Sequence, residues 1–180
     1  MKSHFLLLFI FLGLIQSRSF SQEANSNLLQ NVAAREIQTL DGLWQVIVDP
    51  LENGYYNHRY QPYDNGYFQN AKMQSPSDLI EYDFDTDLEL MVPGDWNTQD
   101  EKLYYYEGTV WYKRSFDFNK QEGKTTFVYF EAANYEAKVY LNGTLVGEHI
   151  GGYTPFQFDV TDLLQEKDNF LVVKVDNKRK

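Results

Sequence analysis

Four carboxylates stand close to the ends of predicted strands, where acid–base chemistry would be placed. Hydrolysis of a glycosidic bond uses two such groups, held at a fixed separation across the bond. Nothing in the local sequence marks any two of the four as such a pair. Because charged side chains are mostly exposed, we interpret them as solvated surface and predict no catalytic residue. The four carboxylates belong to Asp95, Glu107, Glu131 and Glu148.

The sequence contains no pattern typical of a metal site, a phosphate-binding loop or a catalytic thiol. The chain has no cysteine, and His58 and His149 do not stand at the spacing of metal ligands. Gly151-Gly152 precedes Tyr-Thr-Pro-Phe rather than a helix, so it is not a phosphate-binding loop. We therefore expect no metal and no cofactor. Asn142-Gly143-Thr144 matches a glycosylation sequon, but a tight turn explains the same residues, and we favour the turn.

Aromatic residues make up 17% of the chain and gather in two polar loops. The first loop spans residues 52–78 and mixes tyrosines, notably over Tyr55–Phe68, with asparagine and glutamine; the second contains Tyr104-Tyr105-Tyr106. Sugars present apolar C–H faces and hydroxyls, so their binding sites combine flat rings with a few polar groups. The two loops have that composition, which indicates sugar contact. Ordinary packing of tyrosines between loop and sheet is the alternative.

The chain is acidic, with 16 Lys and Arg against 26 Asp and Glu and a net charge of −10 in 180 residues. Nucleic-acid binding needs clustered basic residues, so we exclude nucleic acid as a partner. The hydrophobic share of 43% is that of a globular protein rather than of a disordered chain. Residues 40–180 are enough for one domain with a buried core.

The N-terminus has the pattern of an export signal. Its apolar run, Phe5–Ile15, is too short to span a bilayer, which needs about 20 residues. Ser19-Phe20-Ser21 fits the small-x-small rule of signal peptidase, so we predict a signal peptide over residues 1–21 with cleavage between Ser21 and Gln22. The mature chain is then expected to be periplasmic or secreted, with no membrane partner. A membrane-anchoring helix is the alternative.

The elements that must position the aromatic loops are strands. Short apolar and β-branched runs are separated by turn residues, which predicts an all-β antiparallel sandwich or jelly roll. Asn142-Gly143 lies between two such runs and predicts a two-residue type I′ hairpin. Residues 22–39 are expected to form a flexible lead-in, and residues 161–164 one helical turn at most. The predicted strands are Leu43–Val48, Leu88–Val92, Val110–Phe118, Thr125–Glu131, Ala137–Leu141, Leu145–Glu148, Phe156–Val160 and Phe170–Val175.

Eight short motifs follow one another between residues 39 and 177. They are Leu40–Trp44, Val92–Asn97, Gly108–Arg114, Phe130–Tyr135, Ala137–Gly143, Gly147–Phe156, Phe158–Thr161 and Val175–Asn177. In this order they resemble the N-terminal sugar-binding jelly-roll domain, galactose-binding-like in fold, of glycoside hydrolase family 2. The stretch from Glu148 to Phe156 is most similar to the β-glucuronidase branch, and β-galactosidases are more distant relatives.

The resemblance implies a domain that works beside an immunoglobulin-like domain and a (β/α)₈ barrel with two catalytic glutamates. In the family, one of those glutamates lies in an Asn-Glu-Pro motif, which this chain lacks, and a barrel needs about 250 residues. The family's domain also continues past the position of Lys180, so we expect residues 40–180 to be C-terminally truncated and missing the last strand or strands. In β-galactosidases an asparagine that approaches the substrate stands where this chain has Thr109.

The leading hypothesis is an accessory carbohydrate-binding domain of a truncated or split family 2 glycosidase, β-glucuronidase-like or β-galactosidase-like, and inactive by itself. Its expected partners are an oligo- or polysaccharide and a separate catalytic polypeptide. An independent secreted carbohydrate-binding module and a non-functional remnant are the alternatives. We expect sugar contact at Tyr105, Asn97, Thr109 and Tyr56.

Overall fold

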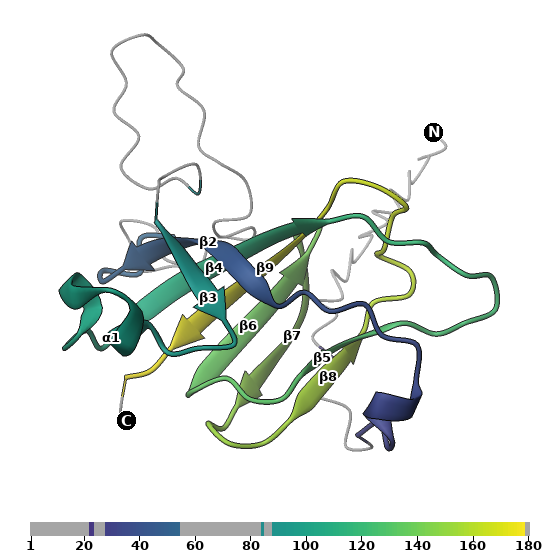
Figure 1. Cartoon of the computed structure of the whole chain (residues 1–180), viewed down its shortest axis with the longest axis horizontal. Coiled ribbons are helices and arrows are strands. Elements are labelled where there is room, and N and C mark those ends of the chain that lie inside the picture. Colours follow the sequence, from purple (N-terminus) through teal and green to yellow (C-terminus); the bar gives the residue numbers. More distant parts are fainter. Residues whose placement is uncertain (1–21, 24–27, 55–83, 85–87, 179–180) are drawn as a thin grey trace, which may run out of the picture.

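The computed structural model describes residues 22–23, 28–54, 84 and 88–178. Most of its regular elements are strands (Figure 1). The helical elements are short: η1 (Val32–Ala34), α1 (Trp96–Gln99) and η2 (Glu101–Leu103). The strands are β1 (Gln22–Glu23), β2 (Gly42–Asp49), β3 (Glu89–Val92), β4 (Thr109–Phe116), β5 (Phe127–Phe130), β6 (Glu136–Leu141), β7 (Thr144–Ile150), β8 (Phe156–Asp159) and β9 (Asn169–Asp176).

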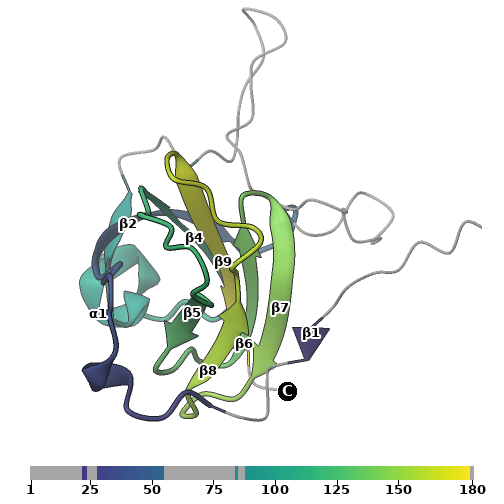
Figure 2. The ribbon, with the colours of Figure 1, turned by 90° about the vertical axis from the view of Figure 1, so that its right-hand side faces the viewer.

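The strands form a large sheet and a small sheet that face each other as two layers (Figure 2). The large sheet has the order β1-β7-β6-β9-β4-β2-β3, and the small sheet pairs β5 with β8. Every described pair is antiparallel except β1 with β7. The prediction of an all-β antiparallel sandwich of jelly-roll type is confirmed, and the short parallel strand β1 is an addition to it.

The predicted strands all occur, and their ends lie within two residues of the predicted ones. The hairpin between β6 and β7 is also confirmed, because φ is 51° at Asn142 and 84° at Gly143. The Asn142 side chain stabilises the turn further: its Nδ2 donates to Leu163 O at 2.9 Å, and its Oδ1 accepts from Phe170 N at 2.9 Å. The turn interpretation of the sequon is therefore the one that the structure supports.

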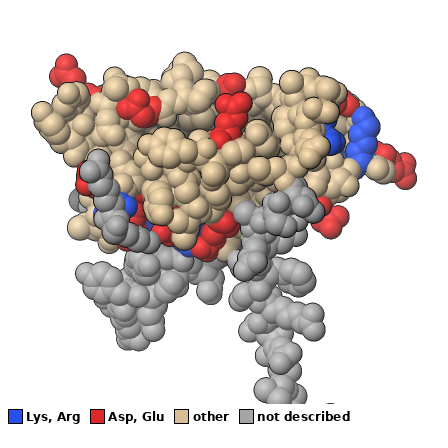
Figure 3. Space-filling view, turned by 90° about the horizontal axis from the view of Figure 1, so that it is seen from below, with Lys and Arg blue, Asp and Glu red and all other residues tan. Residues whose placement is uncertain are grey.

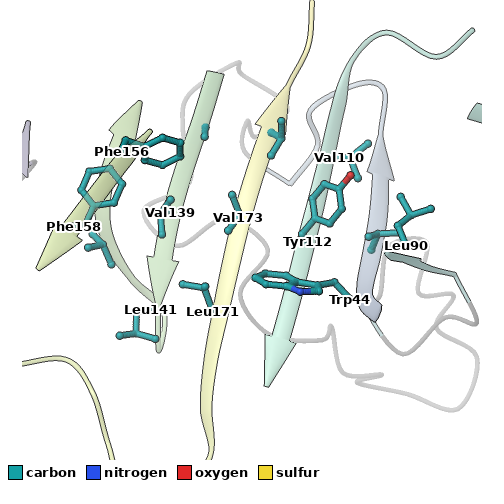
Figure 4. Packing of buried hydrophobic residues seen from close by; sticks show 14 of the residues in the cluster. Trp44, Leu90, Val110, Tyr112, Val139, Leu141, Phe156, Phe158, Leu171 and Val173 are labelled. Carbon is teal, nitrogen blue, oxygen red and sulfur yellow. The ribbon is translucent and has the colours of Figure 1, made fainter. Parts of the chain in front are cut away.

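Alternate residues of the central strands bury one face of the large sheet, because successive side chains of a strand point to opposite faces. Figure 4 shows Phe156 and Phe158 of the small sheet beside Val139 of β6, with Val173 of β9 next to it. Farther along the sheet, the same face is covered by α1, whose Trp96 ring lies 6.4 Å from the Tyr112 ring. The small sheet and α1 thus divide the inner face between them.

The outer face of the large sheet carries a second apolar cluster. Trp111 of β4 and Tyr140 of β6 stack with their ring centroids 6.0 Å apart, and Val172 of β9 is buried with them. Phe84 belongs to the same cluster and is fully buried. Residues on both faces of β9 are buried, and this strand lies in the interior of the sheet between β4 and β6.

Helix α1 is attached to the edge strand β3 by one side chain. Gln99 Oε1 accepts from Met91 N at 2.6 Å, and Gln99 Nε2 donates to Met91 O at 3.1 Å. The amide therefore occupies the place that another strand would take at this edge. Gly94 lies beneath it, since a Cβ at that position would be 2.5 Å from Gln99 Nε2. This contact sets where α1 and the loop after it begin.

The lead-in segment contacts both the small sheet and the loop before it. Leu29 N donates to the Gln157 side chain at 2.9 Å, and Gln38 Nε2 donates to Asp117 O at 2.9 Å. No helix in the described part of the chain is long and apolar enough to cross a membrane. The signal peptide predicted for residues 1–21 lies outside the described residues.

Candidate functional site

Several connections leave the sheets at one end of the sandwich, beside the C-terminal end of β9. Across the large sheet, Thr109 of β4 pairs with Asp176 of β9, Asp176 pairs with Glu136 of β6, and Glu136 pairs with Ile150 of β7. The loops before β4 and β6 and after β7 must therefore share this end. In Figure 1 it lies towards the lower left, where α1 and the chain after β9 are found.

We call this region the aromatic end and define it as residues 93–108, 131–135 and 150–155. Backbone hydrogen bonds join its loops: Gly151 N donates to Tyr135 O at 2.8 Å, and Tyr135 N donates to Asp176 O at 2.9 Å. Exposed apolar side chains that gather on one surface mark a binding surface. The exposed large side chains here are Tyr104 (59%), Tyr105 (90%), Tyr135 (41%), Ile150 (63%) and Tyr153 (92%).

Two short helical turns build the loop that presents Tyr104 and Tyr105. Asp95 caps α1, since its side chain accepts from Thr98 N at 3.0 Å, and Asp100 caps η2 by accepting from Lys102 N at 2.8 Å. Leu103 is buried in the core and holds η2 against the sheet. The two tyrosines that follow are therefore held on a folded loop, and their rings meet edge to face at 4.6 Å.

Asn97 connects α1 to the end of this loop. Its Nδ2 lies 2.6 Å from Leu103 O, 3.3 Å from Tyr104 O and 3.1 Å from Tyr106 O. A primary amide has two N–H donors, so these three carbonyls share them. Asn97 is predicted to contact sugar, but its amide nitrogen points at the protein backbone. These hydrogen bonds fix the path of residues 103–106.

Tyr106 closes the loop from the other side. Its hydroxyl donates to Thr109 O at 2.8 Å, and its carbonyl accepts from Trp96 Nε1 at 3.2 Å. Burial and then the negative charge of Asp49 raise the pKa of the Tyr106 hydroxyl above its usual value. Gly108 has φ 157°, and a Cβ there would lie 2.5 Å from the Tyr106 hydroxyl oxygen.

Thr109 lies beneath the loop and is fully buried. Its hydroxyl donates to Glu52 Oε1 at 3.2 Å, and Lys174 Nζ donates to the same oxygen at 2.8 Å. Partial burial pushes the pKa of Glu52 upward, but the hydrogen bond and the charge of Lys174 outweigh it and hold that pKa below its usual value. The Thr109 side chain therefore belongs to a polar network inside the domain rather than to its surface.

The low pKa of Glu52 predicts a pH-dependent contribution to stability. A carboxyl whose pKa is lowered on folding stabilises the fold above its unfolded pKa, about 4.3, and loses this effect as the pH falls through the folded value. We expect Glu52→Gln to lower the free energy of unfolding by about 1 to 2 kcal/mol at pH 7, because the buried Lys174 would lose this carboxylate partner, and by less at pH 3.

Chemical denaturation of the wild type and of Glu52→Gln at the two pH values measures this difference. Glu36→Gln is the matched control, because Glu36 pairs with Lys124 at the same 2.8 Å but both side chains are more than half exposed. A Glu52→Gln effect that is equal at both pH values would contradict the assignment.

Comparison with known proteins identifies the domain. The profile described as "Glycosyl hydrolases family 2, sugar binding domain" matches residues 37–179. The chain belongs to this family. It is 30% identical to β-glucuronidase of Rattus norvegicus over 138 residues, and 41% identical to β-galactosidase of Thermoanaerobacter pseudethanolicus over 76 residues. Those matches cover 73% and 41% of this chain, and 19% and 10% of the two relatives.

A solved structure of a relative agrees with the fold. Bifidobacterium dentium β-glucuronidase, in complex with coumarin-3-O-glucuronide, superposes with a TM-score of 0.57 at 34% sequence identity. The match covers 78% of this chain and 20% of that one. The matched part spans about a fifth of the length of the Rattus norvegicus and Bifidobacterium dentium β-glucuronidases. The resemblance to the β-glucuronidase branch is confirmed at the level of this sugar-binding domain.

Of the three predicted sugar contacts in the described part of the chain, only Tyr105 is fully exposed. Asn97 is half-buried with its amide nitrogen engaged, and Thr109 is buried. Tyr56 lies outside the described residues, as does the whole aromatic cluster of residues 55–68. Sugar contact at these residues stays a prediction.

The four carboxylates considered for acid–base chemistry have different local roles in this family 2 domain. Asp95 caps α1, and Glu148 forms an ion pair with Lys138 at 2.6 Å. Glu107 and Glu131 are exposed. Among the described residues, no three His, Asp or Glu side chains gather as a metal site would require.

Sequence reasoning missed the third part of the aromatic end. Tyr153 is the most exposed of its rings, and it follows Gly151-Gly152, where φ of Gly151 is 145°. The glycine pair indicated a turn but not its position beside Tyr135. That position depends on the register of β6, β7 and β9, which local sequence does not specify.

Proposed function

We propose that this chain is a carbohydrate-recognition domain that binds glycans through its aromatic end. The observation that carries the proposal is the match of residues 37–179 to the sugar-binding domain of family 2, together with exposed tyrosines on a well-connected loop of that domain. Tyrosine rings stack on the C–H faces of sugars, and polar groups beside them orient the hydroxyls. Tyr105 is the main contact in this proposal.

We further propose that the domain assists a β-glucuronidase-like or β-galactosidase-like glycosidase and does not hydrolyse glycosides by itself. The relatives that it matches are named β-glucuronidase and β-galactosidase, and it spans a small part of their length. Hydrolysis needs two carboxyl groups facing each other across the scissile bond. Of the four carboxylates considered for this role, Asp95 caps a helix and Glu148 forms an ion pair, while Glu107 and Glu131 are exposed on two different loops.

The purified chain should release no nitrophenol from p-nitrophenyl β-glucuronide or β-galactoside above the uncatalysed rate, while glycan binding is retained. A family 2 β-glucuronidase assayed in parallel is the positive control. Turnover that disappears in Glu107→Gln or Glu131→Gln would show that the domain has its own catalytic pair and would overturn the proposal. Failure to bind any glycan would instead favour a non-functional remnant.

An independent secreted carbohydrate-binding module is the second candidate function, and the export pattern of residues 1–21 favours it. We propose that the chain is exported and cleaved between Ser21 and Gln22. Mass spectrometry of the chain recovered from the periplasm or the medium should give an N-terminus at Gln22. Retention of residues 1–21 would contradict both the cleavage and the soluble exported form.

A further inference from the structure

Tyr104 and Tyr105 form an exposed ledge on a hydrogen-bonded turn. Their backbone is fixed by η2, where Tyr104 N donates to Glu101 O and Tyr106 N donates to Leu103 O. The two rings are 4.6 Å apart and nearly perpendicular, and 59% and 90% of the two residues is exposed. A platform that is already ordered loses little conformational entropy when a ligand binds to it. We call this pair the tyrosine ledge.

The segment that carries the tyrosine ledge is rich in acidic residues. Residues 95–107 contain four carboxylates and one cation, Lys102. No ion pair within the described residues involves any of these five groups. On the face seen in Figure 3, acidic residues are spread along the molecule, whereas basic residues lie mainly towards its right-hand end. The four carboxylates belong to Asp95, Asp100, Glu101 and Glu107.

We propose that the tyrosine ledge binds neutral glycans and discriminates against uronic acids, although the domain is similar to β-glucuronidases. This inference rests on the proposed function and adds the class of sugar. Stacking on the rings is the same for a neutral sugar and for its uronic acid, because both have the same C–H faces. Only the uronic acid brings a further carboxylate to this acidic segment. Two lysines oppose the four carboxylates: Lys102 within the segment, and Lys178, which follows Asn177 beside Gly108.

Specific binding of a sugar carboxylate needs a well-placed positive group, which residues 95–107 do not provide. Arginine is the side chain best suited to bind a carboxylate with two hydrogen bonds, and residues 95–107 contain none. Lys102 is exposed, and its backbone N–H is taken by Asp100 in the cap of η2. The charge of the ledge therefore acts against uronic acids without any specific contact.

A matched pair of ligands tests the proposal directly. Cellotetraose and β-1,4-tetraglucuronate differ only at C6, where a hydroxymethyl group is replaced by a carboxylate. We expect the full chain to bind cellotetraose about three- to tenfold more tightly at low salt, and the ratio to fall towards one at high salt, because exposed charges are screened. Titration followed by NMR of ¹⁵N-labelled chain measures both affinities.

Charge variants show whether electrostatic repulsion or the shape of the site causes the preference for neutral sugars. Glu101→Gln combined with Glu107→Gln removes two negative charges without touching either helix cap. It should raise the affinity for tetraglucuronate and leave that for cellotetraose unchanged. Glu122→Gln, in the loop at the opposite end of the sandwich, is the control and should change neither affinity.

The position of the ligand is tested by ring removal. Tyr105→Ala should weaken both ligands by about tenfold, as loss of a stacking ring does in other ligand sites. Ile37→Ala removes an exposed apolar side chain at the opposite end of the sandwich; it is the control and should weaken neither ligand. Tyr153→Ala removes an exposed ring from another loop of the aromatic end and should have a smaller effect than Tyr105→Ala. An equal loss in Tyr153→Ala would place the ligand elsewhere on the aromatic end and overturn the ledge.

The outcomes distinguish this inference from the proposed function. Tetraglucuronate binding as tightly as cellotetraose, or more tightly, would overturn the preference for neutral sugars and leave a carbohydrate-recognition domain in place. Absence of binding by both ligands, in a chain whose NMR spectrum is that of a folded protein, would overturn the proposed function and this inference with it.

Discussion

Replacing Asp49 by Ala is expected to lower the free energy of unfolding by about 3 kcal/mol, because a buried carboxylate that accepts several hydrogen bonds is withdrawn from its donors. Asp49 is fully buried at the end of β2. Its Oδ2 accepts from Trp111 Nε1 at 3.0 Å and from Gly54 N at 2.9 Å, and its Oδ1 accepts from Asn53 N at 2.9 Å. One side chain thus joins the outer-face core to the turn after β2.

Chemical denaturation followed by tryptophan fluorescence measures this effect. Asp162→Ala is the matched control, because Asp162 is exposed and should change stability very little. Asp49→Asn should also be destabilising, since its amide nitrogen would face at least one N–H donor instead of an acceptor. A loss below about 1 kcal/mol in Asp49→Ala would mean that water replaces the carboxylate at this site.

The strands could be predicted from sequence because each carries its own evidence. In β4, Val110 and Tyr112 alternate with Trp111 and Lys113, and the structure places the first two in the inner core and Trp111 in the outer cluster. The hairpin at Asn142-Gly143 was equally local, because positive φ is a property of those two residues. These patterns do not depend on which strands become neighbours.

The candidate site was less predictable because its geometry depends on distant residues. Thr109 is buried, and its hydroxyl donates a hydrogen bond to Glu52, which stands 57 positions earlier in the chain. Helix α1 has only four residues and therefore no period, although Asp95 followed by Thr98 at the third position is a readable N-cap. Tyr105 could be proposed from its type alone, but its exposure could not, since neighbouring Tyr106 is part of the core packing.

Asn97 illustrates how the same residue type supports two functions that only geometry separates. An asparagine near tyrosines fits a sugar site, where its amide would orient hydroxyls. In the structure its nitrogen instead faces the carbonyls of Leu103, Tyr104 and Tyr106. We therefore propose that Asn97 positions the tyrosine ledge and affects binding through the order of the loop, while its direct contact with sugar stays a prediction.

Asn97→Ala should weaken cellotetraose binding by at least tenfold and lower the free energy of unfolding by about 1 to 2 kcal/mol, because two or three partly buried hydrogen bonds are lost. Amide hydrogen exchange distinguishes positioning of the loop from direct contact with the sugar. The amide of Tyr106, which donates to Leu103 O at 2.9 Å, should exchange faster in the variant if Asn97 holds the loop. Asn119→Ala, at an exposed loop position away from the aromatic end, is the control.

Asn97→Asp sharpens the test because it keeps an acceptor oxygen and removes both N–H donors. If the carbonyl oxygen of Asn97 accepted from a sugar hydroxyl, the aspartate would preserve binding. If the nitrogen holds the loop, as we expect, the aspartate should be as damaging as alanine or worse, since its carboxylate would face three carbonyl oxygens. Loss of binding in Asn97→Ala with unchanged exchange at Tyr106, and with binding restored in Asn97→Asp, would make Asn97 a direct sugar contact.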